Sequence, residues 1–134
     1  YKQTGQEGNR YRFITDAIET ASTIDILVDE KGKRGYNAAG TNHHIAFRVE
    51  NDDVQMAFRE KILSAGLQIT PKIDRDYFFS LYFREPAGVL FEIATDNPGF
   101  TVDEPLIQLG SKLKLPKQYE PARAEIERVL PVLK

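Results

Sequence analysis

Two histidines and one glutamate are the residues of this sequence best suited to catalytic chemistry. His43 and His44 are its only histidines, and they begin a strand-like run that extends to Val49. Because successive side chains of a strand point to opposite faces, His44 is expected on the face opposite the apolar residues of this run. Glu92 is the only charged residue of the apolar run Val89–Ala94. A buried carboxylate is costly unless it is paired or binds a cation.

An imidazole and a carboxylate together suit a divalent metal ion. Two histidines and one carboxylate on one face of an octahedron hold the metal of non-haem iron(II) oxygenases, with positions open for substrate and dioxygen. Spacing alone leaves other interpretations open. A histidine at the start of a strand can be an ordinary edge residue, and Glu92 can pair with an arginine such as Arg48 or Arg84.

A predicted hairpin places a tyrosine beside Glu92. The runs Tyr77–Arg84 and Val89–Thr95 have the composition of strands, and residues 85–88 carry proline and glycine at usual turn positions. In an antiparallel pair that places Phe83 opposite Phe91, Tyr82 lies opposite Glu92 on the other face.

The remaining pattern predicts mixed helix and strand around this hairpin. The expected elements are strands at 11–14, 22–28 and 43–49, a helix beginning after Asn51 or Asp52 and ending at Gly66, strands at 67–70, 77–84 and 89–95, and an amphipathic helix at 120–130. Residues 29–42 are expected to form a long exposed loop. In the last helix, Ala124, Ile126, Val129 and Leu130 are expected to dock, so that the tail covers one end of the domain.

Composition narrows the class of protein. The 134 residues are 41% hydrophobic and 10% aromatic, which is typical of one soluble globular domain. A net charge of -2 gives no basic surface for nucleic acid, and no apolar run approaches the length of a membrane span. The absence of cysteine excludes disulfides and thiolate metal sites, and it is compatible with the cytoplasmic location that we expect.

The motifs His43–Phe47 and Tyr82–Ala94, together with the order strand, helix and three strands, resemble the vicinal oxygen chelate superfamily. That superfamily includes glyoxalase I, extradiol ring-cleaving dioxygenases and bleomycin-resistance proteins. More narrowly, the chain is similar to the C-terminal part of bacterial hydroquinone-type ring-cleaving dioxygenases, including the segments at 40–42 and 110–113. The resemblance implies an α+β fold in which a complete βαβββ unit at 43–96 forms a half-barrel. It also implies the strand-rich remainder of a preceding unit at 1–42, and a tail with a helix at 97–134.

The resemblance also implies roles for five residues. His44 and Glu92 correspond to metal ligands, and His43 to a histidine near the substrate that can carry protons. Tyr82 corresponds to a tyrosine that hydrogen-bonds the substrate hydroxyl, and Arg75 to an arginine at the pocket. Two questions remain open. Strand alternation would turn His43 to the packed face unless the strand begins irregularly, and Arg75 can equally be a solvated loop residue between two aspartates.

The chain departs from the family pattern in its ligand set. The intact enzymes that it resembles have two domains with four such units, and their third metal ligand is a histidine near the start of the first domain. This chain has no third histidine and begins with Tyr1, so we expect a C-terminal fragment that lacks its N-terminal domain. Fe(II), or alternatively Mn or Zn, should then be weakly held or absent unless another chain contributes a ligand.

The expected partners are a small aromatic substrate and dioxygen. A single unit exposes an unpaired sheet edge and a concave apolar surface, so we also expect self-association through paired or swapped units. Two other functions remain open on the same scaffold. One is a glyoxalase-like isomerase or lyase that uses zinc or nickel and consumes no oxygen. The other is a metal-free resistance module in which His44 and Glu92 only hydrogen-bond.

Overall fold

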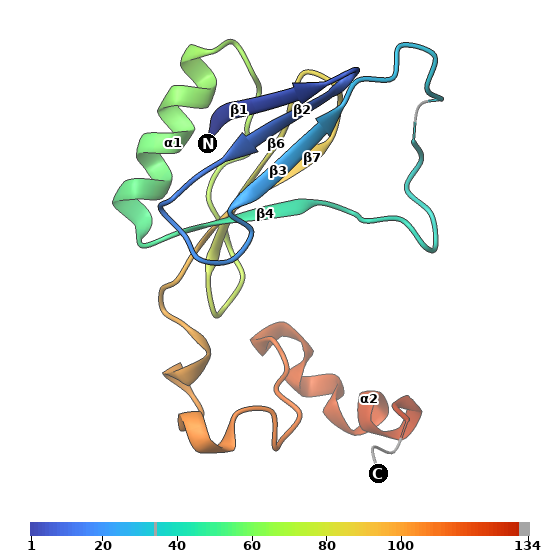
Figure 1. Cartoon of the computed structure of the whole chain (residues 1–134). Helices are drawn as coiled ribbons and strands as arrows, with labels where there is room; N and C mark the ends of the chain where they lie inside the picture. Colours follow the sequence, from blue (N-terminus) through green and yellow to red (C-terminus); the bar gives the residue numbers. More distant parts are fainter. Residues whose placement is uncertain (34, 132–134) are drawn as a thin grey trace. The chain divides into compact units, whose positions relative to one another are not determined.

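The chain folds into two compact units that divide between Thr41 and Asn42 (Figure 1). The computed structural model describes residues 1–33 and 35–131, and each unit has its own β-sheet. The mixture of two sheets with helices confirms the predicted α+β class. Neither α-helix in the described residues has the length and apolar character needed to cross a membrane.

The first unit is an antiparallel sheet in the order β1-β2-β3. Its strands are β1 (Lys2–Glu7), β2 (Arg10–Ile14) and β3 (Thr23–Leu27), and the last two confirm the predicted strands at 11–14 and 22–28 within one residue at each end. The strand β1 was missed because its sequence KQTGQE has no apolar alternation. The dipeptide Gly8-Asn9, which joins β1 to β2 with Gly8 at φ +57°, was the signal that could have revealed it.

The second unit contains the predicted order of strand, helix and three strands. Its elements are β4 (Ile45–Val49), α1 (Asp52–Ser64), β5 (Ile73–Asp74), β6 (Phe79–Arg84) and β7 (Leu90–Thr95). In the sheet the strands follow the order β4-β7-β6-β5, with β4 parallel to β7 and the other pairs antiparallel. One face of this sheet packs against α1, which leaves the other face for the site.

The helix α1 has the ends that the sequence predicted. The side chain of Asn51 accepts a hydrogen bond from the backbone N–H of Val54 at 3.0 Å, and Gly66 follows the helix at φ +80°. The core beneath the helix consists of Val49, Leu81 and Ile93, with Val54, Ile62, Ile69 and Phe83 packed against it. The fully buried Gln55 donates to the carbonyl oxygens of Phe79 and Ile93, each at 2.8 Å, and so ties α1 to β6 and β7.

The predicted strand at 67–70 is wrong, because only an isolated bridge between Ile69 and Phe83 forms there. The carbonyl oxygen of Thr70 accepts a hydrogen bond from Arg59. The backbone N–H of Tyr82 therefore donates to the Thr70 hydroxyl and not to that carbonyl. Pro71 then lacks the N–H that would continue the ladder. The strand that pairs with β6 is therefore the two-residue β5 beyond this proline.

The tail differs from the predicted docked helix. It contains short 3-10 helices at Phe100–Val102, Leu106–Gln108 and Lys117–Ala122, followed by α2 (Arg123–Val129). The helix α2 begins three residues later than predicted, after Pro121, which has no N–H to donate. Docking is wrong for Val129 and Leu130, which are 67% and 45% exposed, and Ala124 is exposed as well. Of the expected docking residues only Ile126 is half-buried.

The predicted loop at 29–42 is confirmed for residues 29–33 and 35–42, all of which are exposed.

Candidate metal and substrate site

Strand pairing on the open face of the second sheet brings the predicted site residues together. The parallel pairing of β4 with β7 sets Ala46 beside Glu92, and the antiparallel pairing of β6 with β7 sets Tyr82 beside it on the other flank. The register predicted for the hairpin, with Phe83 opposite Phe91, is therefore confirmed. Glu92 occupies a central strand with a neighbouring strand on each side.

The side chains of His44 and Glu92 converge across this face. His44 Nε2 lies 2.7 Å from Glu92 Oε2, and the side chains are 34% and 4% exposed. The second carboxylate oxygen, Glu92 Oε1, is buried and has no hydrogen-bond partner among the described residues. An unsatisfied buried acceptor costs about 1–3 kcal/mol, and more when it is charged, so this oxygen is suited to a bound cation.

The two donor groups fit a divalent metal ion. Imidazole nitrogen and carboxylate oxygen are ligands that iron, manganese and zinc accept. Two donors at right angles on one ion, each bonded at about 2.1 Å, would lie about 3 Å apart, and the observed separation of 2.7 Å is close to this value. Within residues 1–33 and 35–131, no group of three or more His, Cys, Asp or Glu side chains is placed to hold a metal. Among these residues, the possible ligand side chains that converge at this site are therefore those of His44 and Glu92.

His43 contacts His44 from outside the strand. The strand β4 begins at Ile45, so the alternation that would have turned His43 toward the packed face does not apply to it. The Nδ1 atoms of the two rings are 3.0 Å apart, and the rings meet edge to face. A neutral imidazole has one donor and one acceptor nitrogen. When His44 donates from Nε2 to Glu92, its Nδ1 must therefore accept the proton of His43 Nδ1.

Tyr82 and Arg75 extend this cluster along the open face. The ring of Tyr82 meets that of His44 edge to face, with centroids 5.8 Å apart. Arg75 donates to the hydroxyl of Tyr82 at 3.5 Å through Nη2 and to Ser80 Oγ at 3.2 Å through Nε. Arg75 is an exposed residue, yet its guanidinium is directed onto β6. The structure thus brings all five predicted residues into one connected set of contacts.

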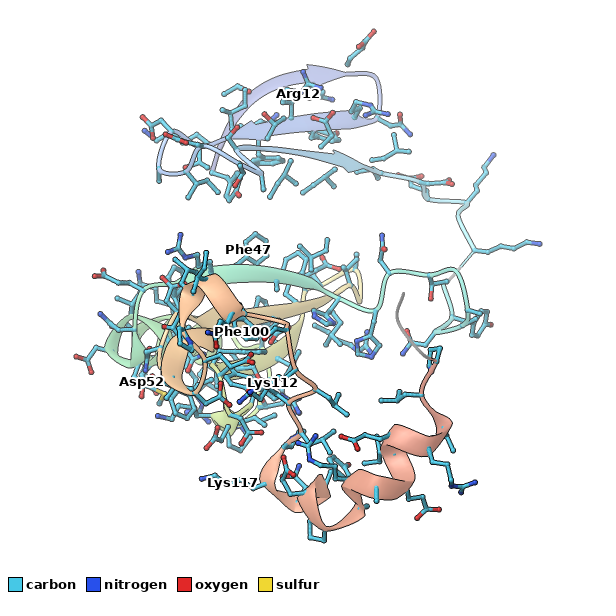
Figure 2. The ribbon with its side chains drawn as sticks, turned by 90° about the horizontal axis from the view of Figure 1, so that it is seen from below. Arg12, Phe47, Asp52, Phe100, Lys112 and Lys117 are labelled. Carbon is cyan, nitrogen blue, oxygen red and sulfur yellow. The ribbon has the colours of Figure 1, made fainter. Side chains whose placement is uncertain are left out.

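A pocket adjoins Glu92 on the same face and includes residues that the sequence interpretation missed. It has a volume of about 290 Å³ and is lined by Ala46, Tyr77, Phe78, Glu92, Ala94, Thr95, Asp96, Gly99 and Phe100. Phe100, labelled in Figure 2, lies in the segment that follows β7 and lines this pocket together with Glu92. No spacing rule connects Phe100 to Glu92, because Phe100 lies in a segment predicted to be irregular.

The aromatic wall of this pocket is a pair of stacked rings. The centroids of Tyr77 and Phe100 are 5.0 Å apart, and the ring planes are inclined by 26°. The Tyr77 hydroxyl donates to Asp103 Oδ2 at 3.0 Å, and the N–H of Gly99 donates to the Tyr77 carbonyl at 2.9 Å. Desolvation and the bond to Asp103 raise the pKa of Tyr77, so its hydroxyl stays protonated at neutral pH.

Comparison with known proteins identifies the family. Residues 3–93 match the model of the Glyoxalase/Bleomycin resistance protein/Dioxygenase superfamily. The chain belongs to this superfamily. This membership confirms the resemblance read from the motifs around His44 and Glu92.

Relatives within the superfamily are named as dioxygenases. The chain is 45% identical over 129 residues to "Putative ring-cleaving dioxygenase MhqO" of Bacillus subtilis (strain 168), covering 96% of the chain and 41% of that protein. It is 36% identical over 132 residues to chlorohydroquinone/hydroquinone 1,2-dioxygenase of Sphingobium indicum, covering 96% of the chain and 41% of the relative.

A solved structure confirms the fold. The crystal structure of a putative dioxygenase from Bacillus subtilis superimposes with a TM-score of 0.90 at 44% identity, covering 99% of this chain and 42% of that one. The chain thus spans about two fifths of the length of the relatives that it matches.

Proposed function

We propose that this chain provides the metal- and substrate-binding part of a ring-cleaving dioxygenase that uses iron(II) to open hydroquinone- or catechol-like rings. The observation that carries the proposal is the pairing of His44 with the buried Glu92, whose second oxygen has no partner among the described residues. Relatives at 36–45% identity carry the names of ring-cleaving dioxygenases, which supports the same reaction class.

In this proposal His44 and Glu92 hold the metal. Iron(II) bound to them would supply adjacent positions for an aromatic diol and dioxygen, and a route for electron density between the two. Manganese or zinc would be accepted by the same donor atoms. Within the described residues no third His, Asp or Glu side chain joins this pair, so a third protein ligand would come from a segment outside them or from a second copy.

The other three residues act on the substrate. The Tyr82 hydroxyl, which accepts a hydrogen bond from Arg75, would hydrogen-bond a substrate hydroxyl next to Glu92. His43 can take up or release a proton beside His44 through Nδ1, and it holds the imidazole of His44 in one orientation. Ala46, which flanks Glu92 on β4, leaves space for the aromatic ring.

An oxygen electrode separates this proposal from the functions left open by the sequence. The protein carrying this chain is loaded anaerobically with Fe(II), Mn(II), Zn(II) or Ni(II), mixed with hydroquinone and then exposed to oxygen. The expected result with iron is one dioxygen consumed for each hydroquinone, with both oxygen atoms recovered in a ring-opened product by mass spectrometry. Isomerase or lyase activity with zinc or nickel and no uptake of oxygen would contradict the proposal, as would hydroquinone binding that needs no metal and gives no product.

A further inference from the structure

The pocket beside Glu92 has the size and chemistry of a subsite for one aromatic ring. Its volume of about 290 Å³ lies just below the range of roughly 300–1,000 Å³ for small-molecule sites, which suits a ligand of one ring. Apart from Glu92, Thr95 and Asp96, its lining is apolar or aromatic, and no lysine or arginine contributes to the lining among the described residues. A carboxylate on a bound ring would lose hydration there without gaining a counter-charge. An uncharged single ring fits the pocket best.

Two features of the pocket define where a ring substituent can go. Ala94 lies two residues from Glu92 on the same face of β7, so its small side chain leaves space directly next to the carboxylate. Phe100 comes from the short 3-10 helix after β7 and forms a wall of the same pocket. The stack with Tyr77 and the bond from Tyr77 to Asp103 hold this wall in place.

From these contacts we propose that Phe100 is a specificity-determining residue that limits the size of the apolar substituent on the substrate ring, and that Ala94 provides the space for it. The reaction in this inference rests on the proposed function, whereas the binding of the ring in the pocket does not depend on it. An aromatic side chain stacked on a second ring presents a rigid face, and such faces favour offset or edge-to-face contact with another aromatic ring. A substituent larger than the space over Ala94 would meet the Phe100 ring.

Opposite substitutions at the two positions test the inference. The measurement uses a series of hydroquinones with substituents from hydrogen to tert-butyl, with Kd from anaerobic equilibrium dialysis and kcat/KM from oxygen uptake. Phe100→Ala should raise kcat/KM for tert-butylhydroquinone relative to kcat/KM for unsubstituted hydroquinone by about 5- to 10-fold. It should also weaken binding of unsubstituted hydroquinone by about 3-fold, measured as Kd. Ala94→Leu should reduce the same ratio by about 10-fold or more, because it fills the space.

Two further variants keep the test independent of folding. Phe100 is 60% exposed, so its truncation should be tolerated, and Phe100→Leu should give an intermediate ratio. Ile107→Ala is the matched control, because Ile107 lies in the same tail and is 93% exposed. Its substrate ratios should equal those of the unchanged protein.

The outcomes distinguish this inference from the proposed function. If the unchanged protein consumes oxygen with hydroquinone but Phe100→Ala and Ala94→Leu leave the size preference unaltered, the specificity pocket is wrong and the dioxygenase proposal stands. If no oxygen is consumed but Kd follows substituent size in opposite directions for the two variants, the dioxygenase proposal is wrong and the pocket stands. A shift in Ile107→Ala equal to that in Phe100→Ala would also overturn the pocket assignment.

Discussion

Asp25 on β3 and Glu92 on β7 are both carboxylates on sheet strands, but they differ in the partners that the fold provides. Asp25 lies directly opposite Arg12 on β2, which donates to it through Nε and Nη2, each at 2.8 Å. Arg10 adds a third bond at 3.1 Å. These bonds hold the pKa of Asp25 at about 2, mainly through the hydrogen bond from Arg12. The carboxylate is satisfied by its own sheet and stays ionised.

Glu92 is more deeply buried than Asp25 but has fewer partners. Its side chain is 4% exposed against 19% for Asp25. The facing groups are a histidine and a tyrosine in place of two arginines, and one oxygen has no partner among the described residues. A carboxylate that already accepts hydrogen bonds from two guanidinium groups cannot bind a metal ion without losing those bonds. Glu92 instead has an oxygen that is available to a metal ion. This difference in partners distinguishes a structural carboxylate from a candidate ligand.

The largest effect is expected from removing the ligand carboxylate. Glu92→Gln should lower metal content and ring-cleaving activity by more than about 100-fold, because even residues behind a ligand contribute about 10- to 100-fold. Metal is measured by elemental analysis of the loaded protein and activity by oxygen uptake. Asp25→Asn is the matched control and should leave both within about 2-fold. Equal losses of metal and activity in the two variants would contradict the assignment of Glu92 as a ligand and Asp25 as a structural carboxylate.

The two units should also differ in how much an apolar strand side chain contributes to the free energy of unfolding. Leu81 is fully buried beneath α1, so Leu81→Ala should lower the free energy of unfolding by about 2–5 kcal/mol. Ile26 in β3 is 49% exposed, and Ile26→Ala should cost less than about 1 kcal/mol. Urea denaturation followed by circular dichroism measures both. A larger cost at Ile26 would contradict the burial assigned to the two sheets.

A smaller effect is expected from the tyrosine beside Glu92. Tyr82→Phe should lower kcat/KM about 3- to 10-fold through loss of one hydrogen bond to the substrate hydroxyl. Metal content should not change, because the hydroxyl is not a ligand in the proposed site. The control is Tyr36→Phe, since Tyr36 is 81% exposed. Loss of metal in Tyr82→Phe would show that the hydroxyl acts through the metal site.

The smallest effect concerns pH and tests the first sheet. The pKa of Asp25 is lowered from 3.8 to about 2 in the folded protein, so its stabilisation is present above pH 4 and is lost as the pH falls toward 2. The stability difference between the unchanged protein and Asp25→Asn should therefore shrink over this range. Thermal unfolding at several pH values between 2 and 7 measures it. A difference that stays constant would mean that Arg12 and Arg10 do not favour the ionised form.

Local sequence rules predicted the elements whose geometry is set by near neighbours. The turn at 85–88 joins two strands directly, so it fixed their register and the position of Tyr82 opposite Glu92. Asn51 and Gly66 marked the ends of α1 through capping chemistry that depends on a few adjacent residues. The same reasoning was wrong for the strand at 67–70, because Arg59, from the helix before it, engages the carbonyl that the ladder needed.

The roles of Arg75 and the tail depended on distant contacts. From charge and spacing, Arg75 could equally lie in solvent or at the pocket. Its hydrogen bond to the Tyr82 hydroxyl depends on the position of β6, which local sequence does not set. An amphipathic pattern at 120–130 showed which residues were apolar but not what would cover them. In the structure Val129 and Leu130 are exposed, so the expected cover does not form.

The sequence by itself determined which residue types were available at the site, the alternation of the strands and the family to which the chain belongs. The tertiary structure decided that His44 and Glu92 meet at 2.7 Å, and that Phe100 joins Glu92 in one pocket. The physical reason is that the parallel pairing of β4 with β7 has no turn to set its register. Packing of side chains between α1 and the sheet sets it instead.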